Sequence, residues 1–309
     1  MIGSILVCGW HIYGQTSATP DQAEAQYRLQ LSVNEVVLTF HAVDQHGLPI
    51  NDLKASEVRV LDNGSPLRRI VAFDSIVNRP LRAAILLDTS ESMQNLVSAS
   101  KQIAQRFAEH IFRQESDQAI LIDFAYASNT AAHWTASPSF LDQAIANAHF
   151  GAMSPVQGTA IFNTLYRTCA YDFKNADPAA TGNLILLFSD GQDNAGLTSM
   201  EEALRACQAS NTVIFAFRLP SGDAEHSTGP KTLTELATNT GGRVFPADDT
   251  PGAIWNELKT IESEMRNKYR LVYTPANLKR DGSFHSIELQ LPDRVDHFDV
   301  RSGYFAARQ

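Results

Sequence analysis

Residues 83–92 read AAILLDTSES, an uninterrupted apolar run followed directly by a cluster of oxygen-bearing side chains. Consecutive apolar residues predict a strand that is covered on both faces, as the inner strands of a parallel sheet are. The polar cluster begins where this strand is expected to end. Because ligands of open α/β sheets bind in the crevice at the carboxyl ends of the strands, this stretch predicts both a fold and the place of a site.

Three more apolar runs lie further along the chain, at 119–122, 184–188 and 213–217. Amphipathic segments alternate with them, and such alternation is typical of strand–helix–strand units around a parallel sheet. Apolar residues recur at helical spacing before the second run and again near residue 260. We also expect helices over about 160–173 and 199–209, the latter capped by Thr198 or Ser199. The central region, residues 80–266, is therefore predicted to be an α/β domain with a doubly wound, mostly parallel sheet.

The flanking regions show a different pattern, because apolar residues alternate with polar ones over 36–42 and 287–291. This alternation predicts half-exposed antiparallel strands. Asn63-Gly64 and Asp281-Gly282 supply residues that tolerate a positive φ, so each is expected to turn a hairpin. The first hairpin is expected to join 58–61 to 67–73, and the second to join 269–274 to 284–291. Neither flank is large enough to bury a core alone. Our hypothesis is a small antiparallel β-sandwich built from residues 28–77 and 268–306, into which the α/β domain is inserted.

Composition excludes several classes of protein. A chain of 309 residues with 44% apolar and 19% charged residues is expected to fold into about two globular domains. The net charge of −9, without a Lys/Arg cluster, argues against nucleic acid as a partner. Outside the N-terminus no apolar run approaches the roughly 18 residues that a membrane span needs.

The N-terminus resembles an incomplete secretory signal. An apolar run within residues 1–18 ends in small residues, but neither Lys nor Arg precedes it. We interpret residues 1–26 as a possible leader and favour export, to the exterior or to the cell envelope or periplasm, over a merely apolar N-terminus. Lipidation of Cys8 is not expected, since Val7 is too large for the preceding position. Cys169 and Cys207 then remain, and we expect two buried free thiols, although a disulfide is possible.

Two further polar segments are expected to reach the edge at which 83–92 ends. Asp190 follows the apolar run 184–188 and so lies at the carboxyl end of a second strand. Thr159 lies in the loop ahead of the helix predicted over 160–173. The alternative is that these residues are only helix caps and turns, but three fragments at matching places favour a shared site. The candidate ligands of that site are Asp88, Ser90, Ser92, Thr159 and Asp190.

A site built only of oxygen atoms favours Mg²⁺, Mn²⁺ or Ca²⁺ over zinc, which prefers histidine or cysteine. Hydroxyls together with water-bridged carboxylates suit Mg²⁺, because this ion often keeps several of its waters. The sequence therefore predicts a magnesium site, with Mn²⁺ or Ca²⁺ as alternatives. We assign no catalytic residue and no organic-cofactor site.

This arrangement resembles the metal-ion-dependent adhesion site of von Willebrand factor type A domains, which occur in integrin I-domains and many bacterial proteins. The resemblance covers residues 80–266 and implies a Rossmann-like fold. It also implies that Ser90, Ser92 and Thr159 touch the ion directly, while Asp88 and Asp190 act partly through water. The whole layout, which ends in 302–305 (SGYF), is similar to bacterial proteins described as von Willebrand factor A-related.

The function that this resemblance implies is adhesion to a protein. Neutral hydroxyl ligands leave the cation under-neutralised, so an Asp or Glu of a partner would be attracted to its open position. Glu91 departs from the family pattern, which usually has glycine there, and its charge is expected to tighten metal binding while weakening binding of an acidic ligand. Asp193 and Asn194 are expected to be solvated turn residues.

Two other functions remain open. In a Mg²⁺-dependent phosphatase-like hydrolase Asp88 would be the nucleophile, but position 90 is serine where such enzymes generally have an acid, and no lysine accompanies Asp190. We therefore do not expect an enzyme. The third reading keeps the fold and makes the ion purely structural, within a scaffold of an envelope assembly.

Overall fold

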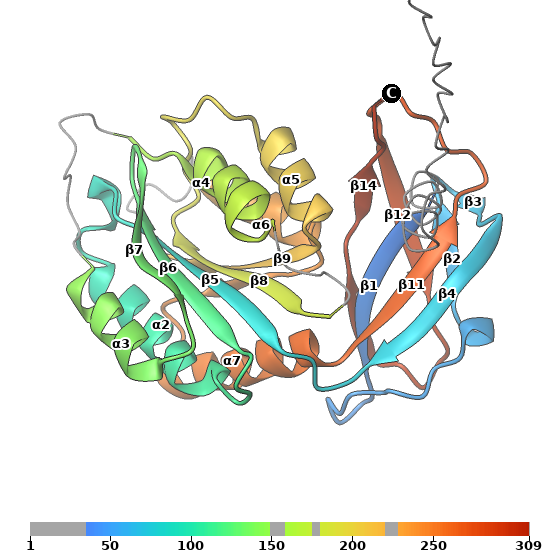
Figure 1. The fold of residues 1–309 in the computed structure, drawn as a ribbon, viewed down its shortest axis with the longest axis horizontal. Coiled ribbons are helices and arrows are strands. Elements are labelled where there is room, and N and C mark those ends of the chain that lie inside the picture. Colours follow the sequence, from blue (N-terminus) through green and yellow to red (C-terminus); the bar gives the residue numbers. More distant parts are fainter. Residues whose placement is uncertain (1–34, 149–157, 175–179, 220–227, 309) are drawn as a thin grey trace, which may run out of the picture.

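The computed structural model describes most of the chain, and the possible leader at 1–26 lies outside the described residues. The described parts are residues 35–148, 158–174, 180–219 and 228–308. They form one mixed six-stranded sheet covered by helices and two smaller antiparallel sheets beside it (Figure 1). None of the helices in these parts is long and apolar enough to cross a membrane.

The six-stranded sheet confirms the predicted α/β class. All of its neighbouring strands run parallel except the last pair. Its order, from one edge to the other, is β10 (Val244–Pro246), β9 (Thr212–Arg218), β8 (Gly182–Ser189), β5 (Leu81–Asp88), β6 (Gln118–Phe124) and the antiparallel β7 (Ser128–Thr135). The quoted stretch thus places its apolar run in a central strand.

Helices cover both faces of this sheet, as the unbroken apolar runs require. On one face lie α2 (Val97–Ile111), α3 (Pro138–Asn147) and α7 (Pro251–Arg266). On the other lie α4 (Ile161–Arg167), continued by a π-helical turn over Thr168–Asp172, α5 (Met200–Ala209) and α6 (Gly229–Thr238). Successive strand residues point to opposite faces, so Leu186 packs in the first core and Leu187 in the second.

The expectation of two free thiols was wrong, because Cys169 and Cys207 form a disulfide. The π-helical turn after α4 carries Cys169, and α5 carries Cys207. These segments pack side by side on the same face of the sheet, which brings the two Cα atoms to 4.8 Å. Such proximity is a property of helix packing, and a spacing of 38 residues gives no sign of it.

The flanking regions meet in two antiparallel sheets, each with strands from both ends of the chain. One has the order β13 (His297–Val300), β1 (Val36–Val43), β11 (Lys268–Thr274) and β4 (Arg69–Ile76). The other has the order β14 (Gly303–Phe305), β12 (Phe284–Gln290), β2 (Arg59–Asp62) and β3 (Ser65–Pro66). Their inner faces share a third core, which includes Phe40, Val60, Tyr269 and Leu289.

The two predicted hairpins turned out differently. Asn63 and Gly64 have φ values of 48° and 71° and turn β2 into β3, so the turn is where it was predicted. The paired strand is only Ser65–Pro66, however, and most of 67–73 belongs to β4 in the other sheet. Asp281-Gly282 does not turn a hairpin, because β11 and β12 belong to different sheets. Tyr269 and Leu289, from these two strands, both face the shared core, so each strand must lie in its own layer to bury its apolar side.

Candidate metal centre

Two of the predicted ligands lie at the carboxyl ends of the two central strands. Asp88 is the last residue of β5, and Asp190 follows the last residue of β8. β5 and β8 are parallel neighbours, with Leu87 opposite Phe188. The register continues to Ser189, whose Oγ donates a hydrogen bond of 2.6 Å to Oδ2 of Asp88. Ser189 also accepts a hydrogen bond from the amide of Gly191, so it links both strand ends.

The two serines lie on the turn that follows β5. The amide of Ser90 donates to Oδ1 of Asp88 at 3.0 Å, which folds the turn back over the strand end. The Oγ atoms of Ser90 and Ser92 lie 3.3 Å apart. Ser90 is buried, whereas Ser92 and Glu91 are exposed at the rim. The hydroxyl pair is therefore close to the buried carboxylates and still open to solvent on one side.

Thr159 is held in place by the loop after β8. Its amide donates to the side chain of Asn194 at 2.7 Å, and its carbonyl accepts from the amide of Asn194 at 2.9 Å. Gly158 precedes it with a φ of 132°, and a Cβ there would lie 2.6 Å from Cβ of Ala195, so only glycine fits this close approach. The loop that carries Thr159 is thus tied to the loop that carries Asp190.

Three residues that were not among the predicted ligands position this site. Asn194 is exposed, as expected of a turn residue, but it also holds Thr159. Asp193 accepts a hydrogen bond from the amide of Phe162 near the start of α4. Ser189 carries the direct contact to Asp88, and it could have been recognised as the last residue of its strand, beside the end of β5.

Electrostatically, the site combines two buried carboxylates, with no Lys, Arg or His side chain paired to either among the described residues. Asp88 is 1% exposed and Asp190 is 3% exposed. Burial raises the pKa of Asp88 to about 6, and the charge of Asp190 adds to this, although hydrogen bonds from Ser189 and Ser90 oppose it. Within the described chain, neither carboxylate forms an ion pair with Lys, Arg or His.

Asp190 supplies the clearest sign that a group belongs here. Its Oδ1 accepts a hydrogen bond from the amide of Gln192, but its buried Oδ2 has no hydrogen-bond partner among the described residues. A buried oxygen without a partner is costly, and a second uncompensated carboxylate beside it increases that cost. A divalent cation with oxygen ligands would satisfy both, so the residues present fit such an ion.

The family model for the von Willebrand factor type A domain matches residues 84–264. No curated protein matches the chain.

Among solved structures, proximal thread matrix protein 1 from the mussel byssus, with a zinc-occupied MIDAS motif, is 15% identical with a TM-score of 0.51. That match covers 65% of this chain but only 50% of the mussel protein. BatB from Bacteroides thetaiotaomicron is 17% identical (59% of this chain, 97% of that one, TM-score 0.47). A von Willebrand factor type A protein from Catenulispora acidiphila is 12% identical (83% and 76%, TM-score 0.47). At such identities the likeness concerns the fold alone.

Proposed function

The chain belongs to the von Willebrand factor type A domain family, and from this premise we propose that it binds an acidic side chain of a partner protein through a divalent cation. Domains of this family are generally metal-dependent modules for adhesion or protein interaction. The observation that carries the proposal for this chain is the buried Oδ2 of Asp190, next to Asp88, which has no hydrogen-bond partner among the residues that the structure describes.

The proposed ligands divide by charge. Ser90, Ser92 and Thr159 would hold the ion through neutral hydroxyls, and Asp88 and Asp190 would act partly through water. When bound, the cation supplies positive charge that attracts a carboxylate to its open position. The exposed rim at Ser92 gives a partner access to that position. Mg²⁺ is the proposed ion, because all five ligands are hard oxygen donors, with Mn²⁺ or Ca²⁺ as alternatives.

Calorimetric titration tests the metal step first. We expect chelator-treated protein to bind one Mg²⁺ or Mn²⁺ per chain, and Asp88→Ala and Thr159→Ala to lose this binding. Glu109→Ala is the matched control, because Glu109 is an exposed acidic residue on α2, away from the site, and its loss should leave the titration unchanged. Absence of metal binding by the wild type would contradict the proposal. Zinc belongs in the same series, because the mussel relative is described with a zinc-occupied MIDAS motif.

A second titration separates adhesion from a purely structural ion. We expect peptides with a central Asp or Glu to bind the Mg²⁺-loaded protein, and matched peptides with Asn or Gln to fail. Chelation should abolish binding. Metal binding without any preference for acidic peptides would instead favour the scaffold function. Metal-dependent turnover of a generic phosphoester that disappears in Asp88→Ala would favour the hydrolase.

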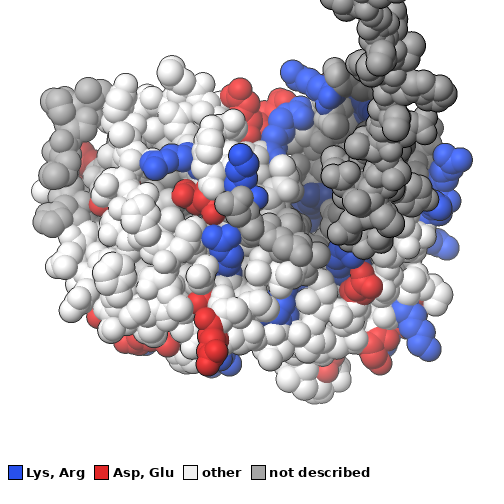
Figure 2. All heavy atoms as spheres, viewed as in Figure 1, with Lys and Arg blue, Asp and Glu red and all other residues white. Residues whose placement is uncertain are grey.

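The proposed place of action is outside the cytoplasm, in the cell envelope or beyond. The Cys169–Cys207 disulfide supports this, because disulfides persist mainly in oxidising compartments. On the face shown in Figure 2, acidic and basic side chains of the described residues lie interspersed, which suits a protein partner better than a polyanion. Fractionation of cells that express the full chain, followed by thiol labelling with and without reductant, would test this location.

A further inference from the structure

A second group of side chains that could hold a metal ion lies where the sandwich meets α7. It consists of His41 on β1 with His297 and Asp299 on β13. One ligand atom of each lies within 4.8 Å of the others. In the antiparallel pair of strands, His41 is opposite Asp299 and Val43 is opposite His297, so the three side chains share one face.

His41 is unusual for a buried histidine. It is 2% exposed, yet neither ring nitrogen has a hydrogen-bond partner in the described parts of the chain. Buried imidazole nitrogens are normally satisfied, and two orphans on one ring point to a missing ligand. The nearest carboxylate is Glu264 on α7, with 3.4 Å between its Oε1 and Nε2 of His41. Burial lowers the pKa of His41, and the nearby Lys268, Arg243 and His297 add to this.

The neighbouring residues leave an entrance and hold the carboxylates in place. The His297 side chain is 53% exposed and its ring centroid is 6.0 Å from that of His41, so an ion can enter from its side. Arg243 donates to Oδ2 of Asp299 and to both carboxylate oxygens of Glu264, which holds these acids in orientation. Ligands of a tetrahedral zinc ion lie about 3.4 Å apart. Nε2 of His297 and Oδ2 of Asp299 are already separated by 3.4 Å.

The charges around the cluster are balanced. Arg243 and Lys268 oppose an incoming cation, whereas Glu264 and Asp299 attract it. Two imidazoles with a carboxylate suit a borderline transition metal and offer little to Mg²⁺. The cluster therefore differs in ligand chemistry from the oxygen-only centre at the end of β5.

We propose that His41, His297 and Asp299 form a second metal site that takes zinc or a similar transition-metal ion, with Glu264 or water as a further ligand. Its ligands come from both flanks of the chain and α7 supplies the adjoining carboxylate. Bound metal would thus fasten β1 and β13 to each other at the junction with the α/β domain. Neither the family match nor the first metal centre is needed for this site.

Zinc titration in an Asp88→Ala background tests the site, because that change is expected to remove metal binding at the first centre. We expect one Zn²⁺ to bind per chain. The affinity for Zn²⁺ should be at least tenfold weaker after His297→Ala or His41→Gln. His133→Ala is the control, since His133 is an exposed histidine on β7 away from the cluster. Zinc should also raise the unfolding midpoint, and His297→Ala should abolish this increase.

Three outcomes would contradict the second metal site. The proposal fails if the Asp88→Ala chain binds no zinc, or if His133→Ala weakens binding as much as His297→Ala does. It also fails if Co²⁺ gives an absorption spectrum in the visible range that His297→Ala leaves unaltered. His297 is exposed and outside the cores, so its alanine variant is expected to fold, and the buried His41→Gln variant is not the only evidence.

Discussion

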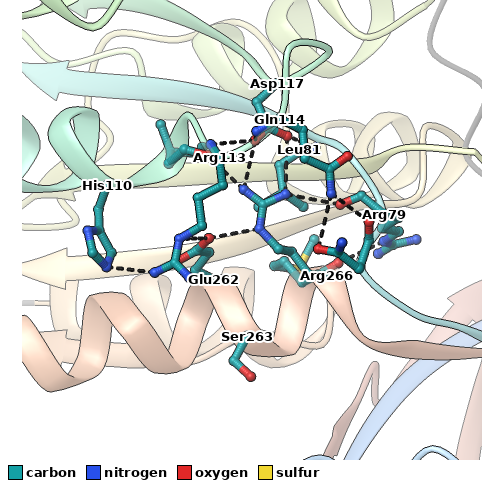
Figure 3. Close-up of polar contacts among 12 residues, drawn as sticks. Arg79, Leu81, His110, Arg113, Gln114, Asp117, Glu262, Ser263 and Arg266 are labelled. Carbon is teal, nitrogen blue, oxygen red and sulfur yellow. Dashed lines mark hydrogen bonds and ion pairs between the residues drawn. The ribbon is translucent and has the colours of Figure 1, made fainter.

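The two ends of the six-stranded sheet both hold buried acids, but they balance the charge differently. At the carboxyl end, Asp88 and Asp190 have no cationic partner within the described residues. At the amino end, Asp117 and Glu262 lie around Arg266, the last residue of α7 (Figure 3). We call the carboxyl end the open end, because its acids are free to bind an external ion. We call the amino end the closed end, because Arg266 of the chain itself neutralises its acids.

The closed end is built around one guanidinium. Arg266 contacts Oδ2 of Asp117 and Oε1 of Glu262, each at 2.8 Å, and donates to the carbonyls of Arg79 and Ile111. Burial by itself would raise the pKa of Asp117, but hydrogen bonds from Arg266 and backbone amides outweigh it and lower the pKa. At Asp88 burial prevails and the pKa rises to about 6.

This difference separates a structural role from a binding role. A buried acid whose hydrogen bonds and opposite charge come from the chain itself needs nothing more, and it ties α7 to the sheet. A buried acid without such a partner destabilises the fold until a cation arrives. The same kind of side chain, on the same sheet, thus serves stability at one end and is proposed to serve metal binding at the other.

Removing Arg266, the basic residue of the closed end, should have the largest effect on stability. Arg266→Met leaves Asp117 and Glu262 buried without their main partner, and we expect the free energy of unfolding to fall by about 3–5 kcal/mol. Denaturant titration measures this. Arg113→Ala is the control, because Arg113 also contacts Glu262 but is 52% exposed, and its loss should cost less than about 1 kcal/mol. Similar losses in both variants would contradict the comparison.

Removing the negative charge of Asp88 at the open end should instead stabilise the metal-free protein. The folded state keeps a proton on Asp88 up to about pH 6, whereas the unfolded chain releases it near pH 4. Stability of metal-free protein should therefore fall as pH rises from about 4 to 6, and then stay low. Asp88→Asn lacks this loss, so at pH 7 without metal we expect it to be more stable by about 3 kcal/mol.

Thermal unfolding at pH 4, 5, 6 and 7, with chelator and with saturating Mg²⁺, measures this effect. Mg²⁺ should raise the unfolding midpoint of the wild type and leave that of Asp88→Asn unchanged. The stability advantage of Asp88→Asn should therefore shrink or reverse. Parallel pH profiles of the two proteins in chelator would show that Asp88 is not the titrating group.

The smallest expected effect concerns the rim of the open end. Glu91 is an exposed acid beside the proposed ion, so Glu91→Gly should weaken Mg²⁺ binding and strengthen binding of an acidic peptide, each about threefold. Glu91→Gln separates the charge from the backbone effect of glycine. Raising the ionic strength should reduce both changes. An unchanged peptide affinity in both variants would remove Glu91 from the account of specificity.

Much of the fold could be predicted because apolar periodicity is a local signal. Unbroken runs such as 184–188 indicate strands covered on both faces, and β8 is buried throughout. Repeats at helical spacing indicated α2 and α7, and the cap at Ser199 was confirmed together with the reciprocal contact from Glu202. The hairpin at Asp281-Gly282 was wrong, because local turn chemistry does not determine which sheet the next strand joins.

The place of the candidate site could be predicted from the sequence for a related reason. In a parallel sheet all carboxyl ends lie at one edge, so Asp88 and Asp190 could be placed together without any distance information. The contacts that hold these residues in place could not be predicted from the sequence. Ser189 meets Asp88 across 101 residues, and Asn194 meets Thr159 across 35. Such contacts depend on how loops settle over a finished sheet.

The sequence by itself thus determined the layers of the α/β domain and the edge at which its polar residues gather, because both follow from short-range patterns of burial. Only the tertiary structure decided the disulfide between Cys169 and Cys207, which flanking strands share a sheet, and the cluster of His41, His297 and Asp299. These features join residues that are distant along the chain, and their proximity arises only when separately formed elements pack together.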